Sequence, residues 1–135
     1  MPTAAAHPDA ADRALRVLVV DDEYEMRYLT KAFLEHAFPG LVVIEADSGA
    51  KGLRLLDDGP VDAIVSDYRM PRMDGLEFLV RACKHVPASA CILMTAYADK
   101  ELQKRAQEAG MTFIEKGGDP ENVVEAVGKL LVPAA

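Results

Sequence analysis

Short runs of apolar residues alternate along the chain with longer segments in which apolar residues recur three or four positions apart. The short runs are rich in β-branched residues and end at polar or turn-forming residues, which is typical of strands buried in a parallel sheet. The longer segments have the spacing of one helix face. The pattern predicts strands at residues 15–20, 41–46, 61–66, 91–94 and 111–114, and helices at 24–36, 48–58, 76–83, 99–108 and 120–131.

Five strands that alternate with five helices predict an α/β fold, a (βα)₅ doubly wound five-stranded parallel sheet with helices on both faces. Asp99 and Asp119 are suitable N-caps for the last two helices, and Gly110 is suited to end the fourth. We expect one domain at residues 15–131, a flexible lead-in at 1–14 and a short tail at 132–135.

Polar residues follow four of the five predicted strands. Asp21 and Asp22 come after the first strand, Asp67 ends the third, Thr95 follows the fourth and Lys116 lies just past the fifth. The carboxyl ends of parallel strands meet at one edge of a sheet, where ligands of such folds bind. We therefore expect these five side chains to converge on one site.

Three crowded carboxylates repel one another unless a cation joins them. Oxygen ligands favour Mg²⁺, or Mn²⁺, over zinc, which prefers His and Cys. A metal ion, the Lys116 ammonium and the Thr95 hydroxyl around Asp67 would make a receptor for a phosphoryl group carried by that carboxylate.

The joint spacing of these residues resembles the receiver domain of two-component response regulators. The resemblance covers residues 15–131 and implies a flavodoxin-like strand order of 2-1-3-4-5. It rests on Val20-Asp21-Asp22, on Asp67-x-x-Met70-Pro71-x-x-Asp74-Gly75, on Met94-Thr95-Ala96 and on Lys116.

By this resemblance Asp67 is the phosphoacceptor, which takes its phosphoryl group from a histidine kinase or a histidine phosphotransfer protein. Asp22 is implied to bind Mg²⁺ directly and Asp21 to bind it through water, while Asp67 and the backbone carbonyl of Arg69 complete the protein's share of the ligands. Met70-Pro71 and Gly75 are implied to shape the loop after the acceptor.

The resemblance also implies a conformational switch. Thr95 would move to hydrogen bond the phosphoryl group, Lys116 would pair with it, and Phe113 would rotate inward. The surface that reads out the change would comprise the fourth helix, fifth strand and fifth helix. The downstream protein or output domain is unknown, and a phosphorylation-dependent dimer is left open.

Two features depart from the family or vary within it. Gly117 follows Lys116 where the family usually has proline, and a second glycine follows it, so this loop gains backbone freedom. Arg69 and Tyr97 are large residues two positions after the acceptor and two after the switch threonine. Our hypothesis is that they hinder the attacking water and lengthen the phosphorylated lifetime.

Charge and composition exclude several classes of protein. The net charge of −7 argues against direct nucleic-acid binding, which needs a surplus of Lys and Arg on one face. No window approaches the roughly 18 apolar residues of a membrane helix, and no secretory signal is present, so we expect a cytoplasmic protein without membrane contact. Cys83 and Cys91 lack metal-ligand spacing and are expected to be small buried hydrophobic residues, although two thiols could pair.

These observations favour a signalling switch that is not an enzyme. The chain ends about four residues after the last predicted helix, which leaves no room for an output segment; a stand-alone receiver and one cut from a larger regulator are equally compatible. The alternative is a Mg²⁺-dependent phosphatase or phosphotransferase with Asp67 as nucleophile, although haloacid dehalogenase-type enzymes place their nucleophile after the first strand. A flavodoxin-like cofactor binder is disfavoured because Asp21-Asp22-Glu23 would repel a phosphate.

Overall fold

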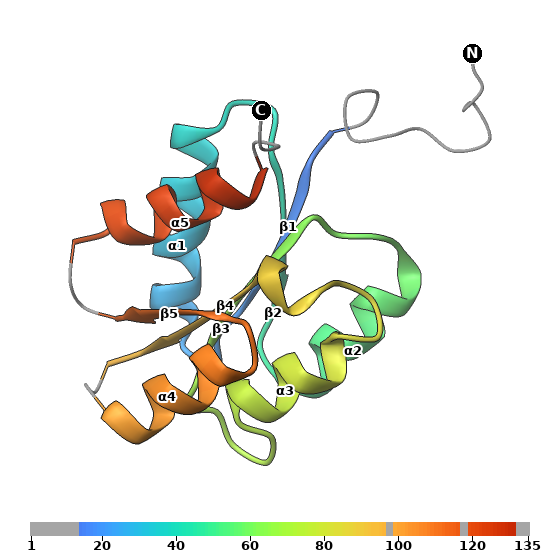
Figure 1. Ribbon diagram of the computed structural model, residues 1–135. Coiled ribbons are helices and arrows are strands. Elements are labelled where there is room, and N and C mark those ends of the chain that lie inside the picture. Colours follow the sequence, from blue (N-terminus) through green and yellow to red (C-terminus); the bar gives the residue numbers. More distant parts are fainter. Residues whose placement is uncertain (1–13, 97–98, 117–118, 132–135) are drawn as a thin grey trace.

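The computed structural model describes residues 14–96, 99–116 and 119–131. Its strands form one parallel sheet in the order β2-β1-β3-β4-β5, with helices on both faces (Figure 1). The strands are β1 (Arg16–Val20), β2 (Val42–Ala46), β3 (Ala63–Asp67), β4 (Cys91–Thr95) and β5 (Thr112–Glu115). The predicted fold class and strand order are both confirmed.

Figure 1 shows α1 and α5 on one face of the sheet and α2, α3 and α4 on the other. The helices are α1 (Tyr24–Ala37), α2 (Gly49–Asp58), α3 (Gly75–Ala82), α4 (Lys100–Glu108) and α5 (Glu121–Leu131). A short 3₁₀ helix, Ala88–Ala90, precedes β4 and was not predicted. None of the helices in the described part of the chain is long and apolar enough to cross a bilayer.

The central strands are buried because each of their two faces meets a helix layer. Val17 and Val19 of β1 point into the core beneath α1 and α5, whereas Leu18 and Val20 point into the core that α2, α3 and α4 cover. Every residue of β3 and β4 is buried, while the edge strands β2 and β5 are partly exposed. The predicted burial on both faces therefore holds for the central strands.

The helix starts follow the expected cap chemistry. The side chains of Ser48, Asp74 and Asp99 each accept a hydrogen bond from a backbone N–H in the first turn of the helix that follows. The Asp119 carboxylate accepts from the N–H of Glu121 in the same way. Gly110, at a φ of +86°, ends α4 in the left-handed conformation that glycine adopts without steric cost.

One prediction about the core is wrong. Cys91 is buried as expected, but Cys83 is exposed to solvent. The reason is its position, because Cys83 is the first residue beyond the last turn of α3 and follows the buried Ala82.

Candidate functional site

The first aspartates lie where β1 ends, beside the switch point at which the chain turns from one side of the sheet to the other. Asp21 is fully buried and Asp22 is exposed. One carboxylate oxygen of Asp21 accepts a hydrogen bond from the N–H of Glu23, and the Asp21 N–H donates to the carbonyl of Ala46 on β2. These bonds hold the Asp21 carboxylate at the carboxyl edge of the sheet.

Asp67 is the last residue of β3 and is only 4% exposed. The chain then leaves the strand and returns at Gly75, whose N–H donates to the carbonyl of Tyr68. A methyl group on Gly75 would collide with the carbonyl oxygen of Asp67. Gly75 is therefore required because two backbone segments touch there, and it lets α3 begin directly beside Asp67.

The three aspartates form one cluster. Asp21, Asp22 and Asp67 each offer a carboxylate oxygen, and these oxygens all lie within 4.8 Å of one another. In the chain's described ranges, no other group of three His, Cys, Asp or Glu side chains is close enough to hold one metal ion.

Lys116 is the cation that faces this cluster. It lies in the turn after β5, where its N–H donates to the carbonyl of Thr95, and its side chain is 8% exposed. The ammonium Nζ lies 2.9 Å from Asp21 Oδ2, 3.4 Å from Asp67 Oδ1 and 3.5 Å from Glu23 Oε1. A single ammonium therefore contacts three carboxylates.

The electrostatics of the site oppose the ionised form of Asp67. Burial raises the pKa of Asp67, Lys116 lowers it, and the charges of Asp21 and Asp22 raise it further, which brings it to about 6. Burial lowers the pKa of Lys116, but hydrogen bonds and attraction from Asp21 and Asp67 outweigh burial and raise it above its ordinary value. Lys116 thus stays charged, and the negative charge on its partners is only partly balanced.

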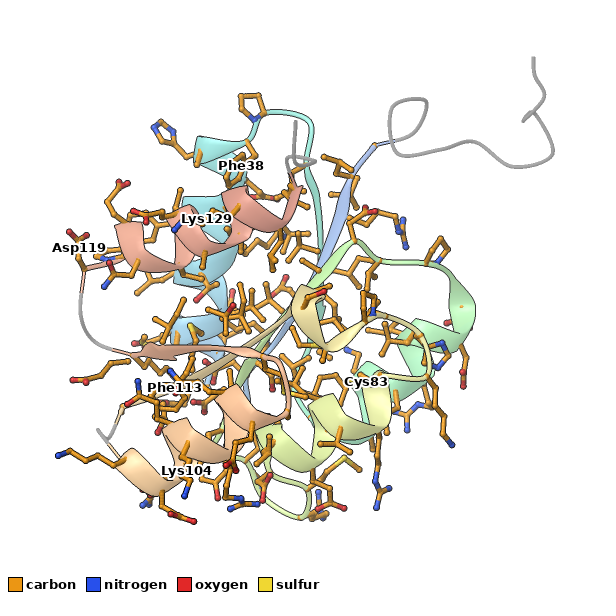
Figure 2. The ribbon with its side chains drawn as sticks, in the orientation of Figure 1. Phe38, Cys83, Lys104, Phe113, Asp119 and Lys129 are labelled. Atoms are coloured by element: carbon orange, nitrogen blue, oxygen red, sulfur yellow. The ribbon has the colours of Figure 1, made fainter. Side chains whose placement is uncertain are left out.

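Thr95 and Phe113 come from the neighbouring strands β4 and β5. Thr95 is the last residue of β4, one position beyond the partner of Asp67 in the strand register, and is 2% exposed. Phe113 is half-buried and packs against the core on the α4 side of the sheet (Figure 2). Thr95 lies at the end of β4, just after the predicted fourth strand, and Phe113 lies in β5, the fifth strand in which it was predicted. Their movement on phosphorylation stays a prediction.

Other predicted residues lie in the loops that surround the cluster. Arg69 is exposed in the loop after Asp67, and the role of its carbonyl as a metal ligand stays a prediction. Tyr97, Gly117 and Gly118 lie outside the described residues. The hypothesis about Tyr97 and the effect of the missing proline therefore also stay predictions.

Sequence reasoning missed two residues of the site. Arg27 lies in the first turn of α1, and its side chain is only 14% exposed. Its Nη1 donates to the carbonyl of Asp21 at 2.7 Å, and its Nε lies 3.1 Å from Oε1 of Glu45 on β2. Glu23, the second missed residue, pairs with Lys116. The only available signal for either residue was closeness in sequence to the acid pair.

Comparisons with known proteins agree with this geometry. The family described as "Response regulator receiver domain" matches residues 17–128. The chain is 33% identical over 99 residues to a probable chemotaxis protein CheY of Rhizobium etli, covering 71% of this chain and 75% of that protein. It is 34% identical over 127 residues to the cyclic di-GMP phosphodiesterase response regulator RpfG of Xanthomonas campestris, covering 91% of this chain but 33% of that protein.

A solved structure shows the same architecture. The CheY-like response regulator receiver domain protein from Methanospirillum hungatei superposes with a TM-score of 0.78 at 29% identity, covering 87% of this chain and 94% of that chain. The match therefore extends over nearly the whole of both chains.

Proposed function

Because the chain belongs to the response regulator receiver domain family, we propose that Asp67 is the residue on which this phosphoacceptor receiver carries its phosphoryl group. The observation that supports the assignment is the surroundings of Asp67. It is a buried carboxylate at the end of a central strand, in contact with the Lys116 ammonium and clustered with two further aspartates.

The residues around Asp67 suit an in-line transfer of the phosphoryl group. One Asp67 oxygen attacks phosphorus while the bond from phosphorus to the donor's histidine nitrogen breaks, and that nitrogen takes up a proton. Lys116 is placed to balance the charge on the transferred group because its ammonium already contacts Asp67. The protein supplies position and charge, which are the main requirements of phosphoryl transfer.

The aspartate cluster fits a magnesium ion. Oxygens that bind one Mg²⁺ at about 2.1 Å lie roughly 3–4 Å apart, so a cluster whose oxygens lie within 4.8 Å needs only small side-chain movements. We assign Asp21, Asp22, Asp67 and the Arg69 carbonyl as the protein's ligands, and Mn²⁺ would suit the same oxygens. When bound, the ion would neutralise charge on the phosphoryl oxygens.

The conformational output follows from the neighbouring strands. A phosphoryl group on Asp67 would offer oxygens to the hydroxyl of Thr95, which ends the adjacent strand. Movement of Thr95 would free space toward β5 for Phe113, and the surface of α4, β5 and α5 would change with it. The downstream partner on this surface is a protein or an output domain.

The phosphodonor is a histidine kinase or a histidine phosphotransfer protein, and we place its contact surface on α1. This helix begins two residues after the acid pair and exposes Tyr24, Tyr28, Leu29 and Phe33. A cavity of about 130 Å³ between α1 and the start of α5 continues the apolar surface toward Lys116. Exposed apolar side chains grouped in this way are typical of a protein contact. A cytoplasmic location stays a prediction.

The relatives differ in how much of their own length the chain spans. The chain spans 33% of RpfG and 52% of the transcriptional regulatory protein YhcZ of Bacillus subtilis, but 75% of the chemotaxis protein. We propose residues 15–131 as the receiver unit, with 1–14 and 132–135 outside it.

The central assignment is tested by intact-mass measurement after treatment with acetyl phosphate and Mg²⁺. The wild-type protein should gain one adduct of about 80 Da, the mass of a phosphoryl group. The Asp67→Asn variant should gain none, whereas Asp58→Asn, which removes an exposed carboxylate at the end of α2, should behave as wild type. An adduct that persists in Asp67→Asn would refute the assignment.

The same protein preparation tests the proposal that the receiver is not an enzyme. We expect single phosphorylation of Asp67 without sustained turnover of small phosphoesters such as p-nitrophenyl phosphate. Multiple turnover that depends on Asp67 would instead identify an aspartate-nucleophile phosphatase.

The lifetime of the phosphorylated form is a separate proposal. We propose that Arg69 and Tyr97 shield the acyl phosphate from water, as their size and their positions after the acceptor and the threonine suggest. Replacing both with alanine should shorten the lifetime measured by loss of the adduct. An unchanged lifetime would contradict the proposal and leave the assignment of Asp67 intact.

A further inference from the structure

The cavity between α1 and the start of α5 is built as a small binding site. Its volume is about 130 Å³, and it lies on the face of the sheet that α1 and α5 cover (Figure 1). The buried side chains of Met94 and Val123, which belong to the core on this face, form part of its wall. Leu29 and Phe33 of α1 also line it and are 46% and 40% exposed, so a dissolved molecule can enter beside α1.

One polar side chain of the cavity wall lacks a hydrogen-bond partner. Thr30 of α1 lines the cavity and is only 7% exposed. Within residues 14–96, 99–116 and 119–131, its hydroxyl makes no hydrogen bond. A threonine hydroxyl can both donate and accept, and burying it without a partner costs free energy. An occupant of the cavity that carries one polar group would satisfy this hydroxyl.

The size and the wall of the cavity suit a single aromatic ring. A protein cavity of about 150 Å³ lined by Leu, Ile and Phe binds benzene, and this cavity is of similar size. Met26 and Met94 both line it, and methionine sulfur makes favourable contacts with aromatic rings. Pockets for drug-sized molecules are larger, at roughly 300–1,000 Å³. The ligand is therefore compact and mostly apolar.

The charges at the rim of the cavity disfavour an anionic ligand. Glu115, Lys116 and Asp119 complete the polar part of the wall, and Figure 2 labels Asp119 just before α5. The Lys116 ammonium is already paired with Asp21 and Asp67. The two remaining carboxylates leave the rim negative, so a ligand that carries a carboxylate or a phosphate would be repelled. A neutral molecule would not.

We propose that this cavity binds a small neutral aromatic molecule with one hydroxyl group, of the phenol class. The ring would lie against Phe33, Met94 and Val123, and its hydroxyl would pair with that of Thr30. The site goes beyond the receiver function, because no step of phosphoryl transfer uses it. It lies beside the α1 surface that we assign to the phosphodonor, but its occupancy is measured without a donor. Failure of either proposal therefore leaves the other intact.

Phenol itself is the probe in the first experiment. Titrated into the wild-type protein at saturating Mg²⁺, it should shift the backbone amide NMR signals of α1 and of the start of α5 saturably. We expect a dissociation constant on the order of 1 mM, as suits a ligand with so few atoms. The signals of α2 and α3, on the opposite face of the sheet, should not move (Figure 1). Benzoate, a ring of the same size with a negative charge, should give no saturable shift.

Two variants test the roles of the wall residues, with circular dichroism to show that each is folded. Thr30→Val keeps the shape of the side chain and removes the hydroxyl. It should weaken phenol binding about tenfold, because the phenol hydroxyl would then be buried without a partner. The same variant should not weaken the binding of toluene, which has no hydroxyl. Val123→Phe should abolish the binding of both molecules, because the larger side chain fills the cavity.

The proposal is overturned if phenol gives no saturable shift, if its shifts spread over both faces of the sheet, or if benzoate binds as tightly as phenol. The cavity would then hold water only. An unchanged phenol affinity in Thr30→Val would overturn it as well, because the hydroxyl would play no part in recognition. The wild-type titrations with phenol and benzoate decide the question even if a variant fails to fold.

Discussion

At the amino edge of the sheet, Arg16 and Asp62 satisfy each other's polar groups, whereas at the carboxyl edge three aspartates share one lysine. The N–H of Arg16 donates to Asp62 Oδ2 at 2.8 Å, the N–H of Asp62 donates to the Arg16 carbonyl, and Arg16 Nε donates to the carbonyl of Pro60. Lys116, in contrast, contacts Asp21, Asp67 and Glu23 while Asp22 adds a further negative charge.

The two edges of the sheet differ in how well their charged and polar groups are balanced, and this difference separates a structural contact from a functional site. The amino-edge pair joins β1 to the residue before β3 through backbone N–H groups that each have an acceptor, so its contribution is structural. The carboxyl edge keeps an excess of buried negative charge, which costs free energy in the metal-free protein and has a use only when a cation and a phosphoryl group are present.

The largest expected effect is on phosphoryl transfer when the carboxyl-edge cation is removed. Lys116→Met should slow phosphorylation of Asp67 by acetyl phosphate on the order of 100-fold, because the charge that stabilises the transferred group is lost. The matched change at the other edge, Arg16→Met, should leave the rate unchanged. Rates are measured by intact mass over time, with circular dichroism to show that both variants are folded. Equal slowing in both variants would show that Lys116 contributes no more to the phosphorylation rate than Arg16 does.

The next prediction concerns stability and has opposite signs at the two edges. In EDTA at pH 7, Asp67→Asn should raise the free energy of unfolding by about 2–3 kcal/mol, because the pKa near 6 means that the buried carboxylate ionises unfavourably. Asp62→Asn should lower it by about 1–2 kcal/mol, because the backbone N–H of Arg16 loses a charged acceptor. Urea unfolding measures both values.

The pH dependence of the first variant has a defined sign. The pKa of Asp67 is raised from 3.8 to about 6 on folding, so the wild-type carboxyl destabilises the native state progressively as the pH rises from about 4 through 6. The advantage of Asp67→Asn should therefore vanish near pH 4 and be fully present above pH 7. Saturating Mg²⁺ should stabilise the wild type and reduce the gap. An advantage that does not change with pH would contradict the charge explanation.

Arg27 tests how the segment that contains Asp21 and Asp22 is held in position. Its contacts with the Asp21 carbonyl and with Glu45 make it a positioning residue, and Arg27→Met should weaken Mg²⁺ binding about tenfold. Lys31 is the matched control, because it pairs with the same Glu45 at 3.3 Å but makes no hydrogen bond to Asp21. Isothermal calorimetry measures both affinities. A similar loss in Lys31→Met would assign the effect to Glu45 alone.

The fold and the main site residues were predictable because they depend on periodicity and on which strand ends carry polar groups. Asp67 and Lys116 lie 49 positions apart, but a parallel sheet brings the ends of their strands to one edge. Arg27 was not predictable, because an arginine on an amphipathic helix is usually exposed, and only the packing of α1 against β2 shows that this one turns inward. The exposure of Cys83 depended on where α3 ends, to within one residue.

The loop after Asp67 holds the smallest expected effect. Arg72 has a φ of +72°, and the N–H of Met73 donates to the carbonyl of Pro71 across it, which forms a strained three-residue γ-turn. Among the described residues Arg72 is the only non-glycine residue with a positive φ, and nothing in the sequence indicated it. The strain lies between Asp67 and the start of α3.

Glycine at this position should relieve the strain. Arg72→Gly should raise the free energy of unfolding by up to about 1 kcal/mol. Glycine adopts this φ without the steric cost that arginine has there, and this gain exceeds the cost of glycine's greater freedom in the unfolded chain. Arg69→Gly, in the same loop but with an ordinary φ, should lower it by about 0.5–1 kcal/mol. Urea unfolding at saturating Mg²⁺ measures both, since the bound ion removes the repulsion among the aspartates. If both variants are destabilised equally, the turn at Arg72 is not strained. The contacts of the loop with Asp67, rather than backbone strain, would then determine the loop's conformation.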